Sequence, residues 1–288
     1  MDPNQKTILI TGCSSGIGWT SAIGLKARGY RVFATARNPA DLQKLEAMGL
    51  EALQLDYRHS ASVQACAAEV KRRTDGKLFA LYNNGAYGQP GAVEDITRAV
   101  LEEQFAANFF GWHELTRACL PMLRANGVGR IVQCSSVLGL VALKYRGPYN
   151  ASKFALEGLT DTLRMELRGS GIKVVTINPG PIATRFVENA RAAFEANVDM
   201  TNSHYVADFE RQRHRLEKAS KSSGTVKKKK LFSFKLPPEA VLEKLVLALE
   251  RENPRNHYYV TIPTHIAAIL RRILSSAWLD RFAIRNSE

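Results

Sequence analysis

The segment Thr7-Ile8-Leu9-Ile10-Thr11-Gly12-Cys13-Ser14-Ser15-Gly16-Ile17-Gly18 joins an apolar run to a turn with three glycines, and a helical pattern follows to about Arg28. The unbroken apolar run predicts a strand that is covered on both faces, as in a parallel sheet. Glycines let the backbone of such a turn approach a phosphate, and the helix N-terminus directs free N–H groups at it. The order strand, glycine turn and helix therefore predicts an anion site. The alternative is an ordinary strand-to-helix turn.

The same turn also fits a second motif. Gly12-Cys13-Ser14-Ser15-Gly16 matches GxSxG, the nucleophile elbow of α/β-hydrolases, which lies in the same strand–turn–helix context. That fold needs an earlier strand and loop to supply part of its oxyanion hole. Only ten residues precede Thr11, so we disfavour the hydrolase interpretation.

Apolar runs and helical patterns alternate beyond this turn. Strands and helices that alternate with short connections predict an α/β domain with a doubly wound parallel sheet of about seven strands. Helices would cover both faces, and a ligand would bind beyond the carboxyl ends of the strands. The expected strands are 7–10, 31–35, 51–55, 78–82, 129–135, 173–178 and 258–262. The expected helices include 40–48, 61–74, 98–124, 149–168 and 237–250.

A second stretch, Tyr149-Asn150-Ala151-Ser152-Lys153, carries acid–base chemistry if it is helical. Positions i and i+4 share one helix face, so the phenol and the ammonium group stand one turn apart. A nearby positive charge lowers the pKa of a phenol, which brings it closer to proton exchange at neutral pH. By itself this spacing is more often a surface pair, so the rest of the chain has to decide.

Three features in register resemble the short-chain dehydrogenase/reductase family: the glycine turn, Tyr149-x-x-x-Lys153, and Ser136, thirteen residues before the tyrosine. The similarity covers about residues 7–186 and includes further motifs in the family's order. These are Asn83-Asn84-Gly85-Ala86, Asn108 in the expected long helix, and Pro179-Gly180-Pro181-Ile182-Ala183-Thr184. The resemblance implies one Rossmann-fold domain over residues 1–288.

The resemblance also implies hydride transfer between a nicotinamide and a carbonyl or alcohol. Tyr149 would be the general acid or base, and Lys153 would lower its pKa and hold the nicotinamide ribose. Ser136 would hydrogen-bond the substrate oxygen, although its neighbour Ser135 is an alternative. Asn108 would hold a water in the proton relay. The opposing hypothesis is a protein that binds NADP(H) as a sensor without turnover, which would not need Ser136, Tyr149 and Lys153 together.

The second expected strand indicates the cofactor. Rossmann sites for NAD place an acid at the end of this strand, whereas sites for NADP favour arginine there. Here no acid occurs and Arg37 follows the strand, so we expect NADP(H). The alternative is an Arg37 that faces solvent. The expected cofactor-binding residues are Gly12, Ser14, Ser15, Gly16, Ile17, Gly18, Arg37, Asp56, Asn83, Tyr149, Lys153, Pro179, Gly180, Ile182 and Thr184.

One departure from the family concerns Asn83-Asn84-Gly85-Ala86, where the usual final Ala-Gly is exchanged. Glycine tolerates a close backbone approach that a Cβ does not. We therefore expect Ala86 to crowd the ribose slightly.

Composition indicates an ordinary globular protein of a reducing compartment. Hydrophobic residues make up 45% and charged residues 23% of the 288 residues. Cys13, Cys66, Cys119 and Cys134 form no ligand or disulfide pattern, and the histidines show no metal-ligand spacing. The chain starts with polar residues and has no long apolar run, so we expect neither a signal peptide nor a membrane-spanning helix. We expect a cytoplasmic protein with no metal and no nucleic-acid partner.

After Thr184 the family pattern fades. Residues 185–236 are expected to form a lid over the substrate, with a helix at 185–216 and a flexible basic connection at 221–230. Apolar positions in this lid suit a bulky apolar carbonyl or alcohol better than a sugar. The arrangement resembles the retinol- and hydroxysteroid-dehydrogenase-like branch, which includes bacterial NADP-dependent aldehyde reductases.

Residues 264–285 read as a basic amphipathic helix. The net charge is +13, and residues 211–288 carry 17 Lys and Arg against 7 Asp and Glu. Such a helix can lie in a membrane interface, which would make the protein peripheral at a membrane surface. The alternative, which we favour slightly from the sequence, is that its apolar stripe packs on its own domain or on a partner subunit in a homodimer or homotetramer.

Overall fold

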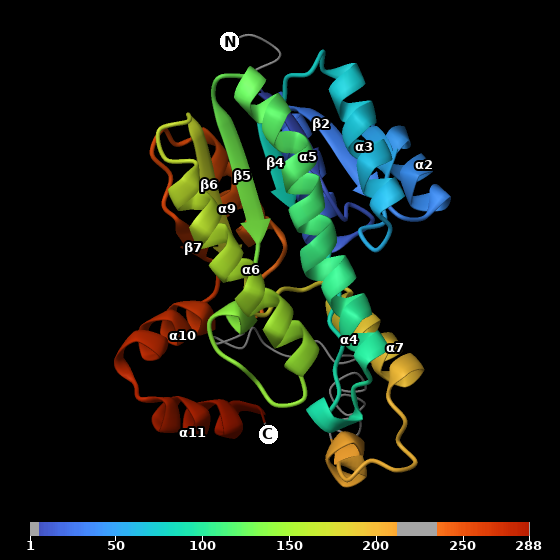
Figure 1. The fold of residues 1–288 in the computed structure, drawn as a ribbon, viewed down its shortest axis with the longest axis vertical. Helices are drawn as coiled ribbons and strands as arrows, with labels where there is room; N and C mark the ends of the chain where they lie inside the picture. Colours follow the sequence, from blue (N-terminus) through green and yellow to red (C-terminus); the bar gives the residue numbers. More distant parts are fainter. Residues whose placement is uncertain (1–5, 212–234, 288) are drawn as a thin grey trace, which may run out of the picture.

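The computed structural model describes residues 6–211 and 235–287, and its centre is a sheet of seven parallel strands (Figure 1). The strands are β1 (Thr7–Ile10), β2 (Arg31–Ala36), β3 (Glu51–Gln54), β4 (Ala80–Asn83), β5 (Gly129–Cys134), β6 (Ile172–Asn178) and β7 (His257–Tyr259). Their order in space is β3-β2-β1-β4-β5-β6-β7. The chain thus winds outward from β1 in one direction and from β4 in the other, which confirms the predicted doubly wound sheet.

Helices cover both faces of the sheet because each parallel strand pair needs a crossover. On one face α3 (Ser60–Arg73), α5 (Gly111–Ala125) and α6 (Gly147–Glu166) lie side by side (Figure 1). On the other face α1 (Gly16–Ala27) packs closely on α9 (Glu239–Glu250), where a Cβ on Gly24 would lie 2.2 Å from Leu242 Cδ2. The helix α2 (Pro39–Ala47) connects β2 to β3.

The core fills the space between these layers. The strand β1 is buried throughout, and Phe33, Tyr82 and Trp112 are among the largest side chains with no exposed surface. Burying a large apolar side chain of this kind contributes roughly 1.5–3 kcal/mol. This packing fixes the strands, and therefore the loops that follow them.

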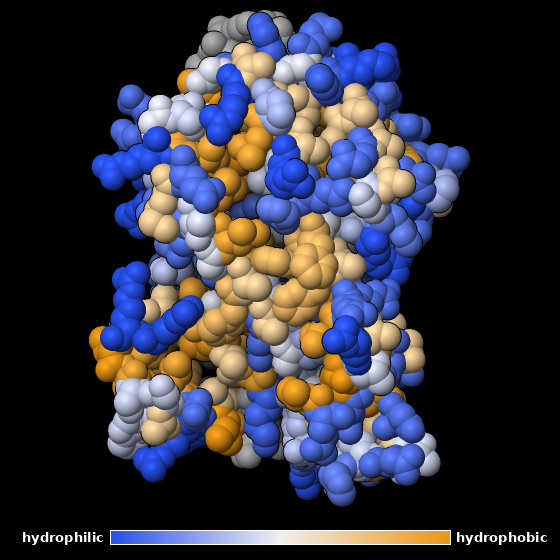
Figure 2. Space-filling view, in the orientation of Figure 1, coloured by the Kyte–Doolittle hydropathy of each residue, from blue (hydrophilic) through white to orange (hydrophobic). Residues whose placement is uncertain are grey.

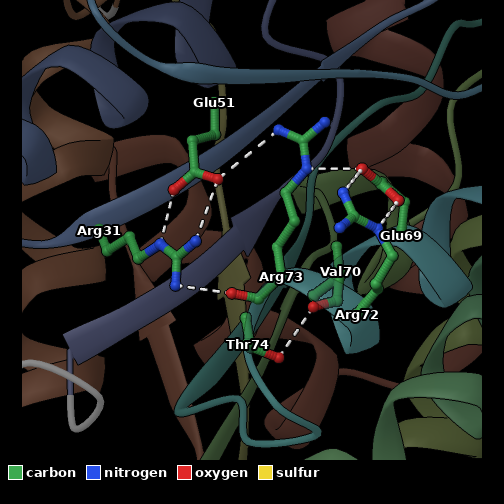
Figure 3. A network of polar contacts seen from close by, with 7 residues as sticks. All are labelled: Arg31, Glu51, Glu69, Val70, Arg72, Arg73 and Thr74. Atoms are coloured by element: carbon green, nitrogen blue, oxygen red, sulfur yellow. Dashed lines mark hydrogen bonds and ion pairs between the residues drawn. The ribbon is translucent and has the colours of Figure 1, made fainter.

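An ion-pair network fastens β2, β3 and α3 together (Figure 3). Arg31 Nε donates to Glu51 at 2.6 Å, and Arg31 Nη1 donates to the carbonyl of Arg73 at 2.9 Å. Arg73 also reaches Glu69 at 2.6 Å. Arg31 begins β2, so the network lies at the end of these strands opposite to Arg37.

The expected long helix over 98–124 is interrupted. It consists of α4 (Arg98–Phe105), a π-helical turn η3 (Ala106–Phe110) and α5. Two shorter 3₁₀ turns, η2 (Val93–Asp95) and η4 (Val137–Gly139), lie in connections.

The C-terminal half differs from the expectation in two places. The expected lid helix at 185–216 ends early: α7 (Phe186–Asn197) stops where Val198 is extended, and helix resumes at 206–211. The charged connection at 221–230 lies outside the described residues. The single helix expected at 264–285 is two helices, α10 (Ile262–Ile273) and α11 (Ser276–Ser287). They separate because Leu274 is extended and the carbonyl of Ser275 accepts from the first N–H groups of α11.

Candidate active site

The site residues expected from the sequence follow the carboxyl ends of six neighbouring strands. Gly12 follows β1, Arg37 follows β2, Asp56 follows β3, Asn83 ends β4, Ser136 follows β5 and Pro179 follows β6. Parallel strands end at the same edge of a sheet, so segments up to 167 residues apart in sequence (Gly12 to Pro179) meet there.

The three glycines of the first turn stand where side chains would collide. A Cβ on Gly12 would lie 2.4 Å from Gly85 Cα, and one on Gly18 would lie 2.2 Å from the carbonyl oxygen of Gly12. Gly12 and Gly16 have φ of +68° and +56°, a region that favours glycine. Ser15 precedes α1 and makes no side-chain capping bond, so its hydroxyl and the first N–H groups of α1 remain available to an anion.

The exchanged pair Gly85-Ala86 has a structural reason. Gly85 is the residue that faces Gly12, and its own Cβ would lie 3.2 Å from Gly12 Cα. The glycine therefore stands where β4 comes closest to the glycine turn, while Ala86 packs against the core.

Asn83, the last residue of β4, is held inside the protein. Its side chain is fully buried, accepts from the Tyr57 hydroxyl at 2.6 Å, and donates to Thr116 and Gln133 at 3.0 Å each. These bonds use both hydrogens of Nδ2, so Asn83 braces the sheet from inside the protein, directly before the loop that follows β4. The next residue, Asn84, donates to the carbonyl of Thr11 at 3.0 Å and secures the glycine turn.

A pocket of about 570 Å³ lies beyond the ends of β2 and β3. Its lining includes Arg37, Asp56 and Arg58, together with Asn38, Gln54, His59, Ala61, Ser62 and Ala65. Arg58 Nη2 lies 2.6 Å from the Asp56 carboxylate and Nη1 lies 2.8 Å from Glu103. Burial opposes ionisation of Asp56, but the Arg58 hydrogen bonds prevail and hold the pKa of Asp56 below its usual range. Arg58, which the sequence analysis did not single out, thus adds a second guanidinium beside Arg37.

The segment after β6 closes over the glycine turn. Thr184 lies so close to Gly16 that a Cβ there would be 2.8 Å from Thr184 Cγ2. The carbonyl of Pro179 accepts from Val137 N at 2.8 Å, which ties this segment to the turn after Ser136. Gly180 packs on Thr261, and Ile182 forms a bridge with Leu236. The expected cofactor-binding residues from this segment and from the glycine turn are therefore neighbours in space.

Tyr149 and Ser136 face each other in the same region. Burial raises the pKa of Tyr149 above its usual range, and a hydrogen bond with the Ser136 side chain lowers it by less. The net direction is opposite to the lowering expected from Lys153. Ser136 Oγ also accepts from Leu138 N at 3.1 Å, whereas Ser135 Oγ is buried without a hydrogen bond among the described residues. Of the two serines, Ser136 is the one that reaches Tyr149.

Lys153 is almost completely buried. Its Nζ donates to the carbonyl of Cys134 at 2.8 Å and lies 4.3 Å from the centre of the Trp112 ring. Burial disfavours the ammonium form and lowers the Lys153 pKa from 10.5 to about 8. Lys153 Nζ is 5.7 Å from the Tyr149 ring centre, so both groups sit in one dry region.

Asn108 lies in the π turn and is fully buried. Its Nδ2 donates to the carbonyl of Tyr87 at 2.8 Å, and its Oδ1 accepts from Tyr87 N at 3.2 Å. It also lies 3.5 Å from Ser152 Oγ on α6, so it connects the bent helix to the helix of Tyr149 and Lys153.

Aromatic residues cover the Tyr149 side of the site. Phe186 at the start of α7 meets the Tyr149 ring at 5.3 Å. Further along the expected lid, Phe209 contacts Phe194 and Tyr145 at ring distances of 4.9 and 5.1 Å. Asn197 donates to Gln89 at 2.8 Å, and Tyr145 donates to Asp208, so α7 and the segment after it are tied to the body.

The sequence analysis missed a buried carboxylate behind Lys153. Glu157 accepts from Asn178 Nδ2 at 2.5 Å and lies 3.7 Å from His257 Nδ1. Burial lowers the pKa of His257, while the nearby Glu157 raises it. The available signal was the i, i+4 spacing from Lys153 to Glu157 on one helix face.

Comparisons with known proteins identify the family. Residues 6–195 match the family model described as short chain dehydrogenase. The chain belongs to the short-chain dehydrogenase family. It is 42% identical over 277 residues to the uncharacterized oxidoreductase YbbO of Escherichia coli, covering 96% of this chain and 93% of that protein. It is 37% identical over 218 residues to human retinol dehydrogenase 8, covering 71% and 69% of the two chains.

A solved structure also aligns with the fold. A variant of the actinorhodin polyketide ketoreductase with NADPH superposes with a TM-score of 0.70 at 26% identity, covering 90% of this chain and 96% of that one. As a short-chain dehydrogenase, this chain is an oxidoreductase for alcohol or carbonyl groups with a nicotinamide cofactor. Among the described residues, no group of three or more His, Cys, Asp or Glu side chains is placed to hold a metal.

The burial of Lys153 should lower the stability of this short-chain dehydrogenase. Replacing Lys153 by methionine should stabilise the free protein by roughly 3 kcal/mol below pH 8, because the folded state no longer buries an ammonium group. The folded pKa is about 8 and the ordinary value is 10.5, so the wild type gains stability as pH rises between them. The difference between the two proteins should therefore shrink toward pH 10.5.

Thermal unfolding from pH 7 to 10.5 measures this difference, with replacement of the exposed Lys77 by methionine as the matched control. A Lys153→Met variant that melts at or below the wild type at pH 7 would contradict the prediction.

Proposed function

We propose that this chain is an NADP(H)-dependent oxidoreductase for the carbonyl or alcohol group of a bulky apolar substrate of the aldehyde, retinoid or ketosteroid type. The observation that carries the proposal is the meeting of Ser136, Tyr149 and Lys153 beside the glycine turn. A hydroxyl, a phenol and an ammonium group in one buried region are what a carbonyl oxygen needs when its carbon gains a hydride.

Each residue has a role that follows from its position. The nicotinamide cofactor supplies the hydride in reduction and accepts it in oxidation. Tyr149 donates its proton to the substrate oxygen, or takes it back, and Ser136 hydrogen-bonds the same oxygen. Lys153 would leave the carbonyl of Cys134 for the ribose hydroxyls, and its ammonium charge then favours the tyrosinate form. Asn108 would hold a water of the proton relay.

Burial of Tyr149 makes this electrostatic help necessary. A phenol whose pKa is raised by burial gives up its proton reluctantly, so oxidation requires a compensating positive charge. Lys153 is a cation within reach of the same region. The pKa of Tyr149 is thus raised in the free protein, and we expect it to be lowered during turnover, when the Lys153 charge acts on it.

The preference for NADP(H) rests on Arg37 and Arg58. Both line the pocket at the ends of β2 and β3, and the carboxylate in that lining, Asp56, is already paired with Arg58. A phosphate there would meet two guanidinium groups, and each charge-assisted hydrogen bond is worth about 1.5–3 kcal/mol. The NADPH bound to the similar ketoreductase supports the same choice.

The apolar substrate class rests on the aromatic cover of the site. Phe186 lies against Tyr149, and Phe194, Tyr205 and Phe209 form a cluster in the expected lid. Rings of this kind offer an apolar surface and few hydrogen-bond partners to a sugar. The similarity to a retinol dehydrogenase supports a long apolar substrate.

A screen of aldehydes, retinoids, ketosteroids and sugars tests the proposal, with consumption of NADPH followed by absorbance and NADH in parallel. We expect turnover with apolar substrates, a preference for NADPH, and no turnover with sugars. An NADPH-binding protein that turns over no member of the panel in either direction would support the sensor hypothesis instead.

A further inference from the structure

The helix α10 exposes a stripe of isoleucines. Ile262, Ile266, Ile269 and Ile273 are 62%, 42%, 59% and 69% exposed. Their spacing of 4, 3 and 4 residues places them within about 60° of one another on the helix. Figure 2 shows orange surface over the position of α10 at the lower left, bordered by blue. Exposed apolar side chains in a continuous row mark a contact surface rather than ordinary solvent-facing residues.

The opposite face of α10 is the one that packs on the domain. Thr264, Ala267 and Ala268 are buried, and they lie about half a turn away from the isoleucine stripe. Arg271 completes this face by donating to the carbonyl of Gly139 at 3.1 Å and stacking 5.0 Å from the Phe154 ring. The sequence hypothesis that the apolar stripe packs on its own domain is therefore wrong for α10: small residues pack, and the isoleucines face outward.

The helix α11 adds an aromatic and basic surface. Trp278 is 60% exposed, and the Arg281 guanidinium lies 5.0 Å from its ring centre. Arg285 falls on the same side of the helix as Trp278 and Arg281. Tryptophan and arginine together are typical of helices that lie in the headgroup region of a bilayer.

The net charge of α10 and α11 distinguishes two possible partners of this surface, a second copy of the chain and an anionic lipid bilayer. The described part of the chain from Ile262 to Ser287 holds Arg271, Arg272, Arg281 and Arg285 against Asp280. In a symmetric dimer through this face, two surfaces with the same excess of positive charge would face each other and repel. An anionic surface would instead attract them.

We propose that α10 and α11 form a docking surface for an anionic lipid bilayer, with the isoleucine stripe and Trp278 inserted at the level of the headgroups and Arg272, Arg281 and Arg285 on the phosphates. None of the helices in the described part of the chain is long and apolar enough to cross a membrane, so the contact is peripheral. The inference does not depend on the proposed function, because it concerns a different surface.

The docking surface is joined directly to the active site. The first turn of α10 packs on Gly180, where a Cβ would lie 2.8 Å from Thr264 Oγ1. Its last turn is bonded to Gly139, three residues after Ser136. A bilayer bound to the outer face of α10 therefore lies one helix diameter from the segments that hold Ser136 and Pro179. An apolar substrate dissolved in the bilayer would be concentrated next to the site.

Vesicle binding tests the proposal with the full-length protein. We expect co-sedimentation with vesicles of phosphatidylcholine and phosphatidylglycerol in equal parts, weakened by added salt and absent with phosphatidylcholine alone. The emission of Trp278 should shift to shorter wavelength on binding and be quenched by brominated lipid. Trp278→Phe should bind but lose most of the shift, because Trp112 is fully buried and Trp19 half-buried.

A pair of double variants locates the surface. Ile269→Glu with Ile273→Glu should lower the vesicle partition coefficient by about 100-fold or more, since each isoleucine removed from the bilayer accounts for roughly tenfold. Val128→Glu with Met165→Glu is the matched control. These residues are 48% and 70% exposed, far from α10 in the fold, and the change in charge is the same. Both double variants keep Lys227–Lys230, so a difference in vesicle binding between them is due to α10.

Three results would overturn the proposal. The first is wild-type protein that ignores anionic vesicles at low salt. The second is that both double variants melt like the wild type and either lose vesicle binding equally or do not lose it at all. The third is a change of mass in solution, without vesicles, in the Ile269→Glu and Ile273→Glu variant alone, which would assign the stripe to a second copy of the chain.

Discussion

Replacing Tyr149 by phenylalanine should lower turnover by on the order of 10³-fold or more, while the Kd for NADPH changes little. The ring stays in place against Phe186, so the packing of the site is retained. Only the hydroxyl that faces Ser136 is lost, and with it the proton that the substrate oxygen receives. Ser136 alone cannot replace it, because a serine hydroxyl without a base is a far weaker acid at neutral pH.

Single-turnover measurements with NADPH, together with a direct titration of cofactor binding, separate the two effects. Replacing Tyr30 by phenylalanine is the matched control, since it removes a phenol hydroxyl at the opposite end of the sheet, 3.5 Å from Glu250. Turnover close to that of the wild type in Tyr149→Phe would exclude Tyr149 as the acid.

Replacing Arg37 by aspartate should reverse the cofactor preference, lowering kcat/KM with NADPH relative to NADH by on the order of 10²-fold or more. The carboxylate repels a phosphate and accepts a hydrogen bond from a ribose hydroxyl instead. Arg58 would remain, but two of its contacts are already spent on Asp56 and Glu103. We therefore expect Arg58 to preserve part of the affinity for NADPH in this variant, but not the preference for NADPH over NADH.

Steady-state kinetics with both cofactors give the selectivity directly. Replacing the exposed Arg28 by aspartate makes the same change of charge at the far end of α1 and should leave the ratio unchanged. If Arg37→Asp also leaves it unchanged, Arg37 points to solvent in the complex, and the preference has to come from Arg58 or from the serines of the glycine turn.

The parts of the site that were predictable are those encoded by short sequence intervals. The glycine turn depends on a strand and a helix that adjoin it, and the pair Tyr149 and Lys153 depends only on the pitch of one helix. Ser136 and Pro179 lie near each other, as expected, because parallel strands end at one edge. Each of these statements needs the order of elements and little else.

The parts that were not predictable depend on contacts between distant segments. The sequence around Lys153 does not indicate that its ammonium group contacts Trp112 and the carbonyl of Cys134. The role of Asn83 depends on Tyr57, Thr116 and Gln133, which come from three other elements. In α10 the period of the apolar residues was clear, but a period does not say which face is covered. Alanines and a threonine packed more closely on the domain than isoleucines.

The π turn at Asn108 has a consequence for the phase of the helix that follows. A π turn holds one residue more than the α-helical turn it replaces, so every side chain of α5 is rotated by about 100° relative to a continuous helix from α4. The π turn takes up one residue without rotating the helix that follows, and for this reason Trp112 reaches Lys153. A regular α-helix over the same number of residues would turn Trp112 away, along with Leu115 and Cys119 behind it. Deleting one residue within Ala106–Phe110 would instead straighten the helix and keep the phase of α5, so Trp112 would stay in place and the wide turn that holds Asn108 would be lost.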